Sequence, residues 1–361
     1  MRAALLREVP GALEIDEVEV GRPGPREVLV RTVAAGLCHS DLHFMEGKYP
    51  YPLPAVAGHE SAGIVEAVGD QVTYVRPGDH VITCLSVYCG NCEACLTGHL
   101  SLCSGKDATR RSPGEPPRLT YGGEAAHPLL DLGSFAERML IHEHALVRIR
   151  DDMPLDRAAL IGCSVTTGVG AVFNTAQVAP GSTVAVVGCG GVGLNCIQGA
   201  ALAGASRVIA VDTVPSKLDM AEQFGATHAV DASEDDPVGR VRDLAGGGVH
   251  YSFEAIGMKQ TSEQAFGMLR AGGTCTIIGM IPVGQSVEIP GYELLSEKRL
   301  MGSNMGSNRF RVDMPRYIDL YLDGRLKLDE LVSRRIGLDE VNAGFDAMKA
   351  GEVCRSVILF E

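Results

Sequence analysis

Two hydrophobic patterns divide the chain. Over residues 1 to about 150, apolar and polar positions alternate in short runs, as in Val28–Val33 and Gly63–Val68, and Gly and Pro interrupt these runs. This period of two predicts β-strands, because successive side chains of a strand point to opposite faces. From about residue 160 to 300, continuous apolar runs alternate with helical segments. That order predicts βαβ units on a parallel sheet.

The same pattern places individual elements in the second half of the chain. Buried strands are predicted at Val184–Val187, Arg207–Val211 and Thr274–Ile278. Beyond residue 300, helices are predicted at Met314–Leu322 and Leu338–Ala350, and a final strand at Ser356–Phe360. The segment Ser104–Leu132 is rich in Pro, Gly and charged residues, so we expect an exposed loop there.

Length and charge narrow the class of protein. A chain of 361 residues is long for one domain, and two domains are expected. The formal net charge of −13 argues against a nucleic-acid or anionic-membrane partner, since such partners need a basic surface. One stretch, Val184–Ala205, carries no charge and is long enough to suggest a membrane span. Its glycines would break a helix near its start, so we interpret it as strand, turn and helix.

Cysteine usage and the first residues indicate a compartment. The segment MRAALLREVP has no apolar core and no cleavage site of a secretory signal. Eleven cysteines, an odd number, fit a reducing environment better than a disulfide scaffold. We therefore expect a cytoplasmic protein.

Four cysteines lie close together in the sequence C-G-N-C-E-A-C-L-T-G-H-L-S-L-C. They are Cys89, Cys92, Cys95 and Cys103. Four soft sulfur ligands at such spacing suit a closed, tetrahedral structural Zn²⁺ site. Gly and Asn between them are typical of a wrapped loop. Unrelated core cysteines or disulfides are the alternatives.

A glycine-rich motif follows the strand at Val184–Val187. It runs Gly188-Cys-Gly-Gly-Val-Gly193 and precedes a helical stretch, Leu194–Ala203. A strand, a tight glycine turn and a helix N-terminus together bind a dinucleotide pyrophosphate. Asp212 ends the next predicted strand, 19 residues after Gly193. A carboxylate there accepts hydrogen bonds from ribose hydroxyls and repels a 2′-phosphate, which favours NAD over NADP. A strand-end turn residue is the alternative for Asp212.

Three further segments hold possible metal ligands. They are Cys38-His39-Ser40-Asp41-Leu42-His43, Gly58-His59-Glu60 and Cys163-Ser164. A catalytic zinc usually has three protein ligands and one open position, and Cys38, His59 and Cys163 would supply two sulfurs and one imidazole. Spacing alone does not distinguish this trio from ordinary core or surface residues.

Taken together, these motifs resemble the zinc-containing medium-chain alcohol dehydrogenases, in particular their dimeric, class I/III-like branch. The resemblance covers nearly the whole chain. It includes Thr166-Thr167-Gly168 after Cys163 and Arg355 near the C-terminus, and the motifs follow the family's order. It implies a GroES-like, mostly-β catalytic domain made of residues 1–160 and 301–361. A Rossmann domain with a doubly wound parallel sheet would occupy residues 161–300, and the active site would lie in the cleft.

The resemblance also implies roles for single residues. Cys38, His59 and Cys163 would bind the catalytic zinc, whose Lewis acidity makes an alcohol acidic enough to give hydride to nicotinamide. Ser40 and His43 would relay the alcohol proton to the surface. Asp41 would orient His59, and Glu60 would lie behind the metal. An ordinary exposed histidine is the alternative for His43, and buried acids paired elsewhere are the alternative for Asp41 and Glu60.

The remaining residues implied by the resemblance bind the cofactor or the substrate. Leu85 would line the substrate pocket, or could be plain core. The cofactor-binding set comprises His39, Thr167, Gly188, Gly190, Gly191, Val192, Gly193, Asp212, Lys217 and Arg355. His39 and Arg355 would contact the pyrophosphate, Thr167 the nicotinamide and Lys217 the adenosine ribose.

The predicted function is an NAD-dependent zinc alcohol dehydrogenase with two zinc ions per chain, acting on primary or aromatic alcohols. A long interval between Cys103 and Cys163 resembles that of dimeric members, so a homodimer is expected. The first alternative is a formaldehyde dehydrogenase that uses glutathione or mycothiol. Glutathione-type enzymes carry acidic residues where this chain has Gly47–Pro54, which contains none, but Lys106, Arg110 and Arg111 could meet an acidic substrate. A non-catalytic binding protein on the same fold is the remote alternative.

Overall fold

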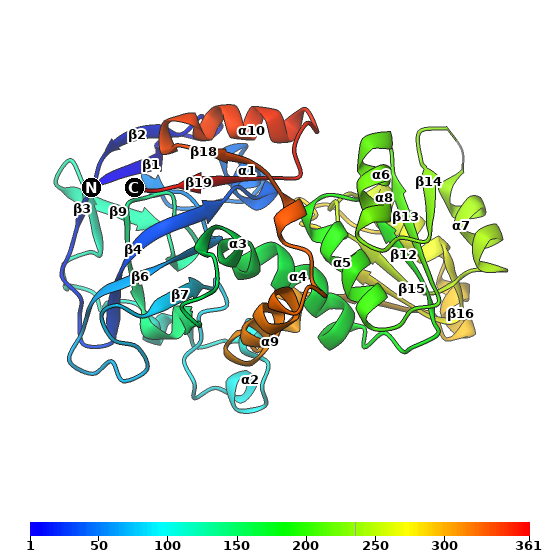
Figure 1. The fold of residues 1–361 in the computed structure, drawn as a ribbon, viewed down its shortest axis with the longest axis horizontal. Helices are drawn as coiled ribbons and strands as arrows, with labels where there is room; N and C mark the ends of the chain where they lie inside the picture. The colour runs from blue at the N-terminus through cyan, green and yellow to red at the C-terminus, as the bar shows by residue number, and fades with distance from the viewer. Residues whose placement is uncertain (235) are drawn as a thin grey trace. The chain divides into compact units, whose positions relative to one another are not determined.

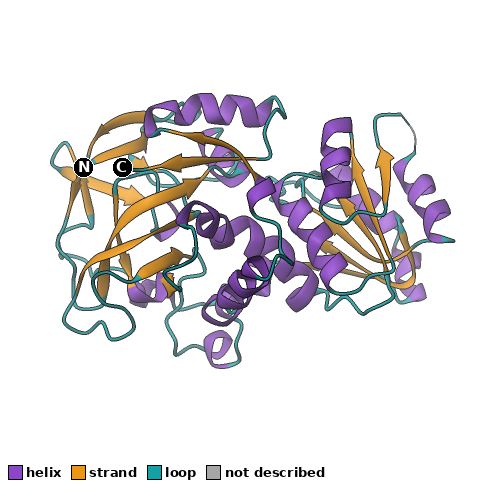
Figure 2. Ribbon diagram, viewed as in Figure 1, coloured by secondary structure: helices purple, strands orange, loops and turns teal. Residues whose placement is uncertain are grey.

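The computed structural model describes residues 1–234 and 236–361, which form two compact units. The first unit combines Met1–Cys163 with Arg309–Glu361, and the second unit is Ser164–Asn308. Strands dominate the first unit, whereas strands and helices alternate in the second (Figures 1 and 2). The hydrophobic pattern predicted a strand-rich part and a part made of βαβ units on a parallel sheet, and the structure confirms both.

The first unit is built on two sheets. One has the strand order β2-β1-β5-β9-β8-β3, and the other has the order β11-β7-β6-β4-β19-β18 with β10 added to β4. The strands are β1 (Arg2–Leu6), β2 (Glu14–Glu17), β3 (Glu19–Val20), β4 (Glu27–Gly36), β5 (Ala55–Val56), β6 (Ser61–Val68), β7 (His80–Thr83), β8 (Leu119–Tyr121), β9 (Glu124–Pro128), β10 (Arg138–His142), β11 (Leu146–Arg148), β18 (Val332–Ile336) and β19 (Arg355–Leu359). Its helices are α1 (His39–Met45), α2 (Glu93–Leu96), α3 (Leu155–Leu160), α9 (Phe310–Leu322) and α10 (Val341–Lys349).

Strand β4 explains why the sequence folds this way. Val28, Val30 and Thr32 are buried, whereas Leu29 and Arg31 between them are only partly covered, as the alternating pattern predicts. β4 pairs with β6, with β10 and with the C-terminal strand β19, all antiparallel. Strand β19 is therefore part of the same sheet as β4, β6 and β10, although more than three hundred residues separate it from β4 in the sequence.

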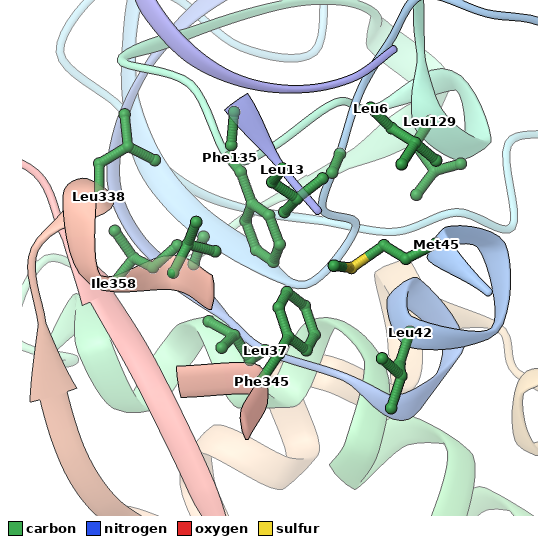
Figure 3. Close-up of a cluster of buried hydrophobic side chains, with 14 of the residues drawn as sticks. Leu6, Leu13, Leu37, Leu42, Met45, Leu129, Phe135, Leu338, Phe345 and Ile358 are labelled. Carbon is green, nitrogen blue, oxygen red and sulfur yellow. The ribbon is translucent and has the colours of Figure 1, made fainter. Parts of the chain in front are cut away.

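A hydrophobic core packs beneath this sheet. Figure 3 shows Leu37, Leu42 and Phe345 among its members, together with Leu129 and Phe135 from a loop after β9. Leu42 comes from α1 and Phe345 from α10. Because segments from residue 6 to residue 358 share this core, it fixes the start of α1, where several candidate site residues lie.

The second unit is a six-stranded parallel sheet with the order β14-β13-β12-β15-β16-β17, beside which helices α5 to α8 lie (Figure 1). Its elements are α4 (Thr166–Gly170), β12 (Thr183–Val187), α5 (Gly191–Leu202), β13 (Arg207–Asp212), α6 (Pro215–Gln223), β14 (His228–Asp231), α7 (Pro237–Ala245), β15 (Val249–Glu254), α8 (Lys259–Gly267), β16 (Leu269–Ile277) and β17 (Arg299–Gly302). The strand order reverses between β12 and β15. Ligands of such folds bind beyond the carboxyl ends of the strands at this switch point.

Two stretches of the chain are apolar enough to suggest a membrane span. The uncharged stretch Val184–Ala205 forms strand β12, a turn and helix α5, as predicted. A helical run, Leu155–Thr175, is also long and apolar enough to span a membrane, but 83% of its most apolar window is buried inside the structure. That burial is typical of a core helix.

The segment Ser104–Leu132 corrects one expectation. It is not simply an exposed loop, because it contributes β8 and β9 and buries the side chain of Arg118, which is only 8% exposed. Arg118 and Arg111 both bind the carboxylate of Glu27, at 2.7 and 2.6 Å. Charge in this segment is therefore paired inside the fold, which the composition alone does not reveal.

Candidate metal and dinucleotide sites

Cys38, His59 and Cys163 converge in the first unit. Their ligand atoms all lie within 4.8 Å of one another, and their side chains are 4%, 0% and 5% exposed. Cys38 caps the N-terminus of α1, His59 directly precedes β6, and Cys163 follows α3 in the long helical run. Segments 104 residues apart in sequence, from His59 to Cys163, thus meet in one small volume.

The imidazole of His59 is oriented for a ligand. Asp41 accepts a hydrogen bond from Nδ1 of His59 at 2.9 Å, and both side chains are fully buried. Nε2 is buried with no hydrogen-bond partner among the described residues, although such an atom is costly to leave unpaired. One imidazole nitrogen fixed by a carboxylate and the other directed at two sulfurs is the donor set of a zinc site.

The two thiols of this trio differ in acidity. A hydrogen bond from Cys163, aided by the charges of Arg355 and His59, holds the pKa of Cys38 well below its usual range despite burial. A cysteine binds zinc as the thiolate, so surroundings that favour a thiolate suit a metal ligand.

The cysteine quartet forms a second cluster in the same unit. The Sγ atom of Cys92 lies 3.5 Å from that of Cys95 and 3.8 Å from that of Cys103, and the Sγ atoms of Cys89 and Cys95 are 4.0 Å apart. Sulfurs at the corners of a tetrahedron with zinc–sulfur bonds of about 2.3 Å would be about 3.8 Å apart. All eleven cysteines are free, so the disulfide alternative does not describe this structure.

Backbone N–H groups support these sulfurs. The N–H of Cys89 points to the Sγ atom of Cys103 at 3.2 Å, and the N–H of Asn91 points to that of Cys89 at 3.4 Å. Backbone donors from Cys95 and Ser104 lower the pKa of Cys92 to about 5. Donors aimed at sulfur stabilise thiolates, so this lobe also fits a metal ion.

The glycine motif of the second unit has the three features that a pyrophosphate turn needs. Gly188 has a φ of +94°, which favours glycine, and it starts the tight turn after β12. A Cβ on Gly193 would lie 1.7 Å from the carbonyl oxygen of Gly188, so only glycine permits this close packing. A Cβ on Gly190 would meet no described atom within 4 Å, which leaves open space for a ligand at the N-terminus of α5.

Asp212 lies at the end of β13, beside this turn. Its Oδ2 accepts a hydrogen bond from the N–H of Cys189 at 2.7 Å, and its Oδ1 accepts from the N–H groups of Thr213 and Val214. The structural alternative for Asp212 is thus realised, since the carboxylate ties two loops together. Its carboxylate is only partly buried and can accept further hydrogen bonds.

Comparison with known proteins decides the family. The alcohol dehydrogenase GroES-like domain model matches residues 24–151, and the zinc-binding dehydrogenase model matches residues 191–323. An NDMA-dependent alcohol dehydrogenase from Amycolatopsis methanolica is 40% identical over 99% of this chain and 98% of its own length. The chain belongs to the zinc-containing medium-chain alcohol dehydrogenases. The GroES-like and Rossmann folds predicted from the sequence are therefore confirmed, and the chain is an oxidoreductase of this family.

Two further relatives of this dehydrogenase family show the range of its members. S-(hydroxymethyl)glutathione dehydrogenase from Paracoccus denitrificans is 37% identical over 99% of each chain. The crystal structure of benzyl alcohol dehydrogenase from Acinetobacter calcoaceticus superposes with a TM-score of 0.94, at 33% identity, over 100% of this chain and 99% of that one. Relatives that share this fold are thus named for different substrates.

The charges of Glu60 and Arg355 act on the cysteines of the trio. Glu60 is fully buried and forms an ion pair with Arg355, whose Nη1 lies 3.5 Å from its carboxylate. Arg355 is 3% exposed and also donates to the carbonyl of Leu37 at 2.8 Å. Its pyrophosphate role remains a prediction, as does that of His39, which is exposed at the start of α1.

The two residues predicted to relay a proton, Ser40 and His43, both lie on α1. The hydroxyl of Ser40 lies 3.5 Å from the Sγ atom of Cys38, so it is beside the trio. His43 is half-buried, stacks on Tyr49, and has an Nδ1 atom without a hydrogen-bond partner in the described part of the chain. Burial and the nearby Lys48 lower the pKa of His43, which keeps its imidazole neutral and able to accept a proton.

The other predicted residues have these positions. Leu85 follows β7 and packs, half-buried, against a core cluster, so the structure leaves both of its interpretations open. Thr167 is buried on α4 and donates to the sulfur of Met305. Lys217 is half-buried on α6, and Gly191 and Val192 form the first turn of α5.

One residue of the second unit was missed in the sequence. Glu254 ends β15 at the switch point, is fully buried, and accepts hydrogen bonds from the N–H groups of Ile256 and Gly257 and the hydroxyl of Thr261. It therefore shapes the loop that packs against Gly188. An acid at the end of an apolar strand, as at Asp212, is the signal that could have found it.

Asp41→Asn should weaken zinc binding at the trio by about 10–100-fold, because asparagine keeps the shape but not the charge that makes His59 a strong ligand. Competition with a chelator of known affinity measures this. Glu66→Gln is the control, since it neutralises a carboxylate in the same unit that pairs with Arg138 on the surface. Equal affinities in the Asp41 variant and the unmodified protein would contradict the orienting role.

Proposed function

We propose that this protein is an NAD-dependent alcohol dehydrogenase that transfers hydride reversibly between a primary or aromatic alcohol and the nicotinamide. The convergence of Cys38, His59 and Cys163, with Nε2 of His59 buried and directed at two sulfurs, carries the proposal. We further propose that the first unit is the catalytic domain, that the second binds NAD, and that the chain holds a second, structural zinc at the cysteine quartet.

Side chains of this protein orient the metal ligand His59 and transfer the substrate proton. Zinc, when bound, supplies a Lewis acid that makes a hydroxyl acidic near neutral pH, and nicotinamide accepts the hydride. Asp41 holds His59 in one tautomer through the 2.9 Å hydrogen bond. Ser40 takes the substrate proton beside Cys38, and His43, kept neutral by burial, receives it nearer the surface. Burial of the trio excludes water, which strengthens each electrostatic contact.

Asp212 is proposed to select NAD. Asp212→Gly should lower the ratio of kcat/KM for NAD over NADP by about tenfold or more, since removing a carboxylate opposite a 2′-phosphate relieves a repulsion of over about 1.4 kcal/mol. Steady-state kinetics with both cofactors measure this ratio. Asp231→Gly, at the end of the neighbouring strand β14, is the control. An unaltered ratio in the Asp212 variant would leave only its structural role.

A substrate panel tests the reaction itself. We expect purified protein with two zinc ions per chain to reduce NAD in the presence of simple primary or aromatic alcohols. Removal of zinc with a chelator should abolish this activity, and zinc should restore it. Full zinc loading without activity on any alcohol or aldehyde would instead favour a non-catalytic binding protein.

A thiol-dependent formaldehyde dehydrogenase is the second candidate. The 37% identity to S-(hydroxymethyl)glutathione dehydrogenase favours it. Two observations weaken it. Gly47–Pro54 has no acidic residue, which weakens the glutathione version and does not bear on the mycothiol version. The arginines considered for an acidic substrate are occupied, Arg110 by Asp131 and Arg111 by Glu27. Formaldehyde oxidation only with glutathione or mycothiol present would establish this function.

A homodimer in the cytoplasm is the proposed state of the protein. Strand β17 is an edge of its sheet, and all four of its residues are exposed. Leu300 and Met301 on this strand and Tyr292 and Leu295 just before it expose apolar surface. An edge with unpaired backbone groups and apolar side chains suits pairing with a second copy of the chain. The solution mass from light scattering tests this.

A further inference from the structure

The loop between β9 and β10 contains unusual backbone conformations. Leu130 and Asp131 have φ values of +53° and +64°, and Gly133 has a φ of +60°. Left-handed conformations crowd the Cβ of any residue other than glycine, so two such residues in succession are unfavourable. They persist only when surrounding contacts determine them, and such strain collects at functional sites. Leu129–Ser134 is named the strained loop here.

Two side chains outside the strained loop hold its shape. The hydroxyl of Tyr51 donates to the carbonyl of Pro128 at 2.8 Å and accepts from the N–H of Leu130 at 3.1 Å. The guanidinium of Arg110 donates hydrogen bonds to both carboxylate oxygens of Asp131, at 2.9 and 3.1 Å. Tyr51 thus binds the backbone at Leu130 and just before the loop, and Arg110 binds the side chain of Asp131, so both side chains contact residues with positive φ.

The strained loop lies against the backbone that carries His59. The N–H of Ser134 donates to the carbonyl of Gly58 at 3.0 Å, and the N–H of Phe135 donates to that of Ala57 at 2.8 Å. Gly58 has a φ of +91°, and a Cβ there would lie 2.4 Å from the ring of Phe135. Leu129, at the start of the strained loop, and Phe135, the residue after its end, are both buried in the core (Figure 3).

We propose that Arg110 and Tyr51 are positioning residues for the catalytic metal. By fixing the strained loop, they hold the turn at Gly58 and so keep His59 directed at Cys38 and Cys163. This inference rests on the proposed zinc site. It assigns Arg110 a role inside the protein, in place of the substrate contact considered from the sequence.

Zinc release provides the test. Arg110→Lys keeps the positive charge but loses the bidentate hydrogen bonds to Asp131. Tyr51→Phe keeps the ring but loses both hydrogen bonds of the hydroxyl. Each change should speed release of zinc from the trio to a coloured chelator about tenfold or more. Release from the cysteine quartet should stay unchanged. Zinc should leave in two phases, one from each site. A Cys38→Ser variant, in which only the quartet is complete, shows which phase comes from the quartet.

A matched control separates positioning from general loosening. Arg150 donates the same bidentate pair of hydrogen bonds to Asp152, at 2.6 and 2.8 Å. Its side chain is 51% exposed, and that of Arg110 is 52% exposed. Arg150→Lys should leave both release phases unchanged. Unchanged release in the Arg110 and Tyr51 variants, or equal acceleration of both phases, would overturn the proposal. Because release needs no turnover, the test still reads out if the oxidised substrate is not an alcohol.

Discussion

Cys38→Ser should lower kcat/KM for alcohol oxidation by about a thousandfold, because losing a Lewis acid worth several kcal/mol costs about tenfold per 1.4 kcal/mol. Serine is a far weaker ligand than a thiolate, and the pKa of Cys38 is already depressed in the fold. NAD binding should remain nearly intact, since the glycine turn and Asp212 belong to the second unit. Steady-state kinetics, cofactor titration and elemental analysis of zinc together measure the outcome.

The control for this variant is the same substitution at Cys84. Cys84 is fully buried in the same unit and belongs to neither cysteine cluster. Burial raises the pKa of Cys84 to about 11, so it stays a neutral thiol. Cys84→Ser should keep both zinc ions and most of the activity. Full activity in the Cys38 variant would refute the assignment of the catalytic metal.

Cys92→Ser should have the largest effect on stability. Its sulfur lies within 4 Å of those of Cys95 and Cys103, so its loss opens the tetrahedron of the quartet. We expect loss of one zinc ion and a fall in Tm of about 5–10 °C, since losing a few kcal/mol lowers Tm by about 2–4 °C per kcal/mol in a domain of this size. Differential scanning calorimetry with zinc analysis measures both.

Activity distinguishes this effect from damage to the catalytic site. At temperatures well below the lowered Tm, the Cys92 variant should retain turnover, because the trio lies elsewhere in the unit. Thr97→Ala, which removes a helix-capping contact in the same lobe without touching a sulfur, is the matched control. A Cys92 variant with full zinc content and unchanged Tm would show that the quartet holds no structural ion.

Local patterns in the sequence sufficed for much of the fold. Strand β4 shows the expected alternation, and the uncharged stretch after residue 184 is a strand, a turn and a helix because glycines interrupt it. The quartet was predictable from the sequence for the same reason, since its four sulfurs come from one short segment. The trio was not, because Cys38 and Cys163 meet only through the tertiary fold, and the family resemblance was needed to connect them.

Other features depended on contacts that no local pattern encodes. The charged segment after Cys103 was expected to be exposed, yet Arg118 is buried because Glu27, 91 residues earlier in the chain, neutralises it. Positive φ at Leu130 could not be predicted, since leucine does not favour that conformation, and aspartate, as at Asp131, adopts it only in some contexts. Glu254 was missed because its partners are mostly backbone N–H groups, which the sequence does not distinguish.

The pairing of β19 with β4 has a consequence for the order of folding. The N–H of Leu37 donates to the carbonyl of Ser356, and Arg355 donates to the carbonyl of Leu37 across a sequence separation of 318 residues, so a strand far along the chain holds the residue just before Cys38. Contacts of such long sequence separation form late in folding. The trio is therefore complete only after these distant segments have met, so we expect a metal ion to bind late in folding.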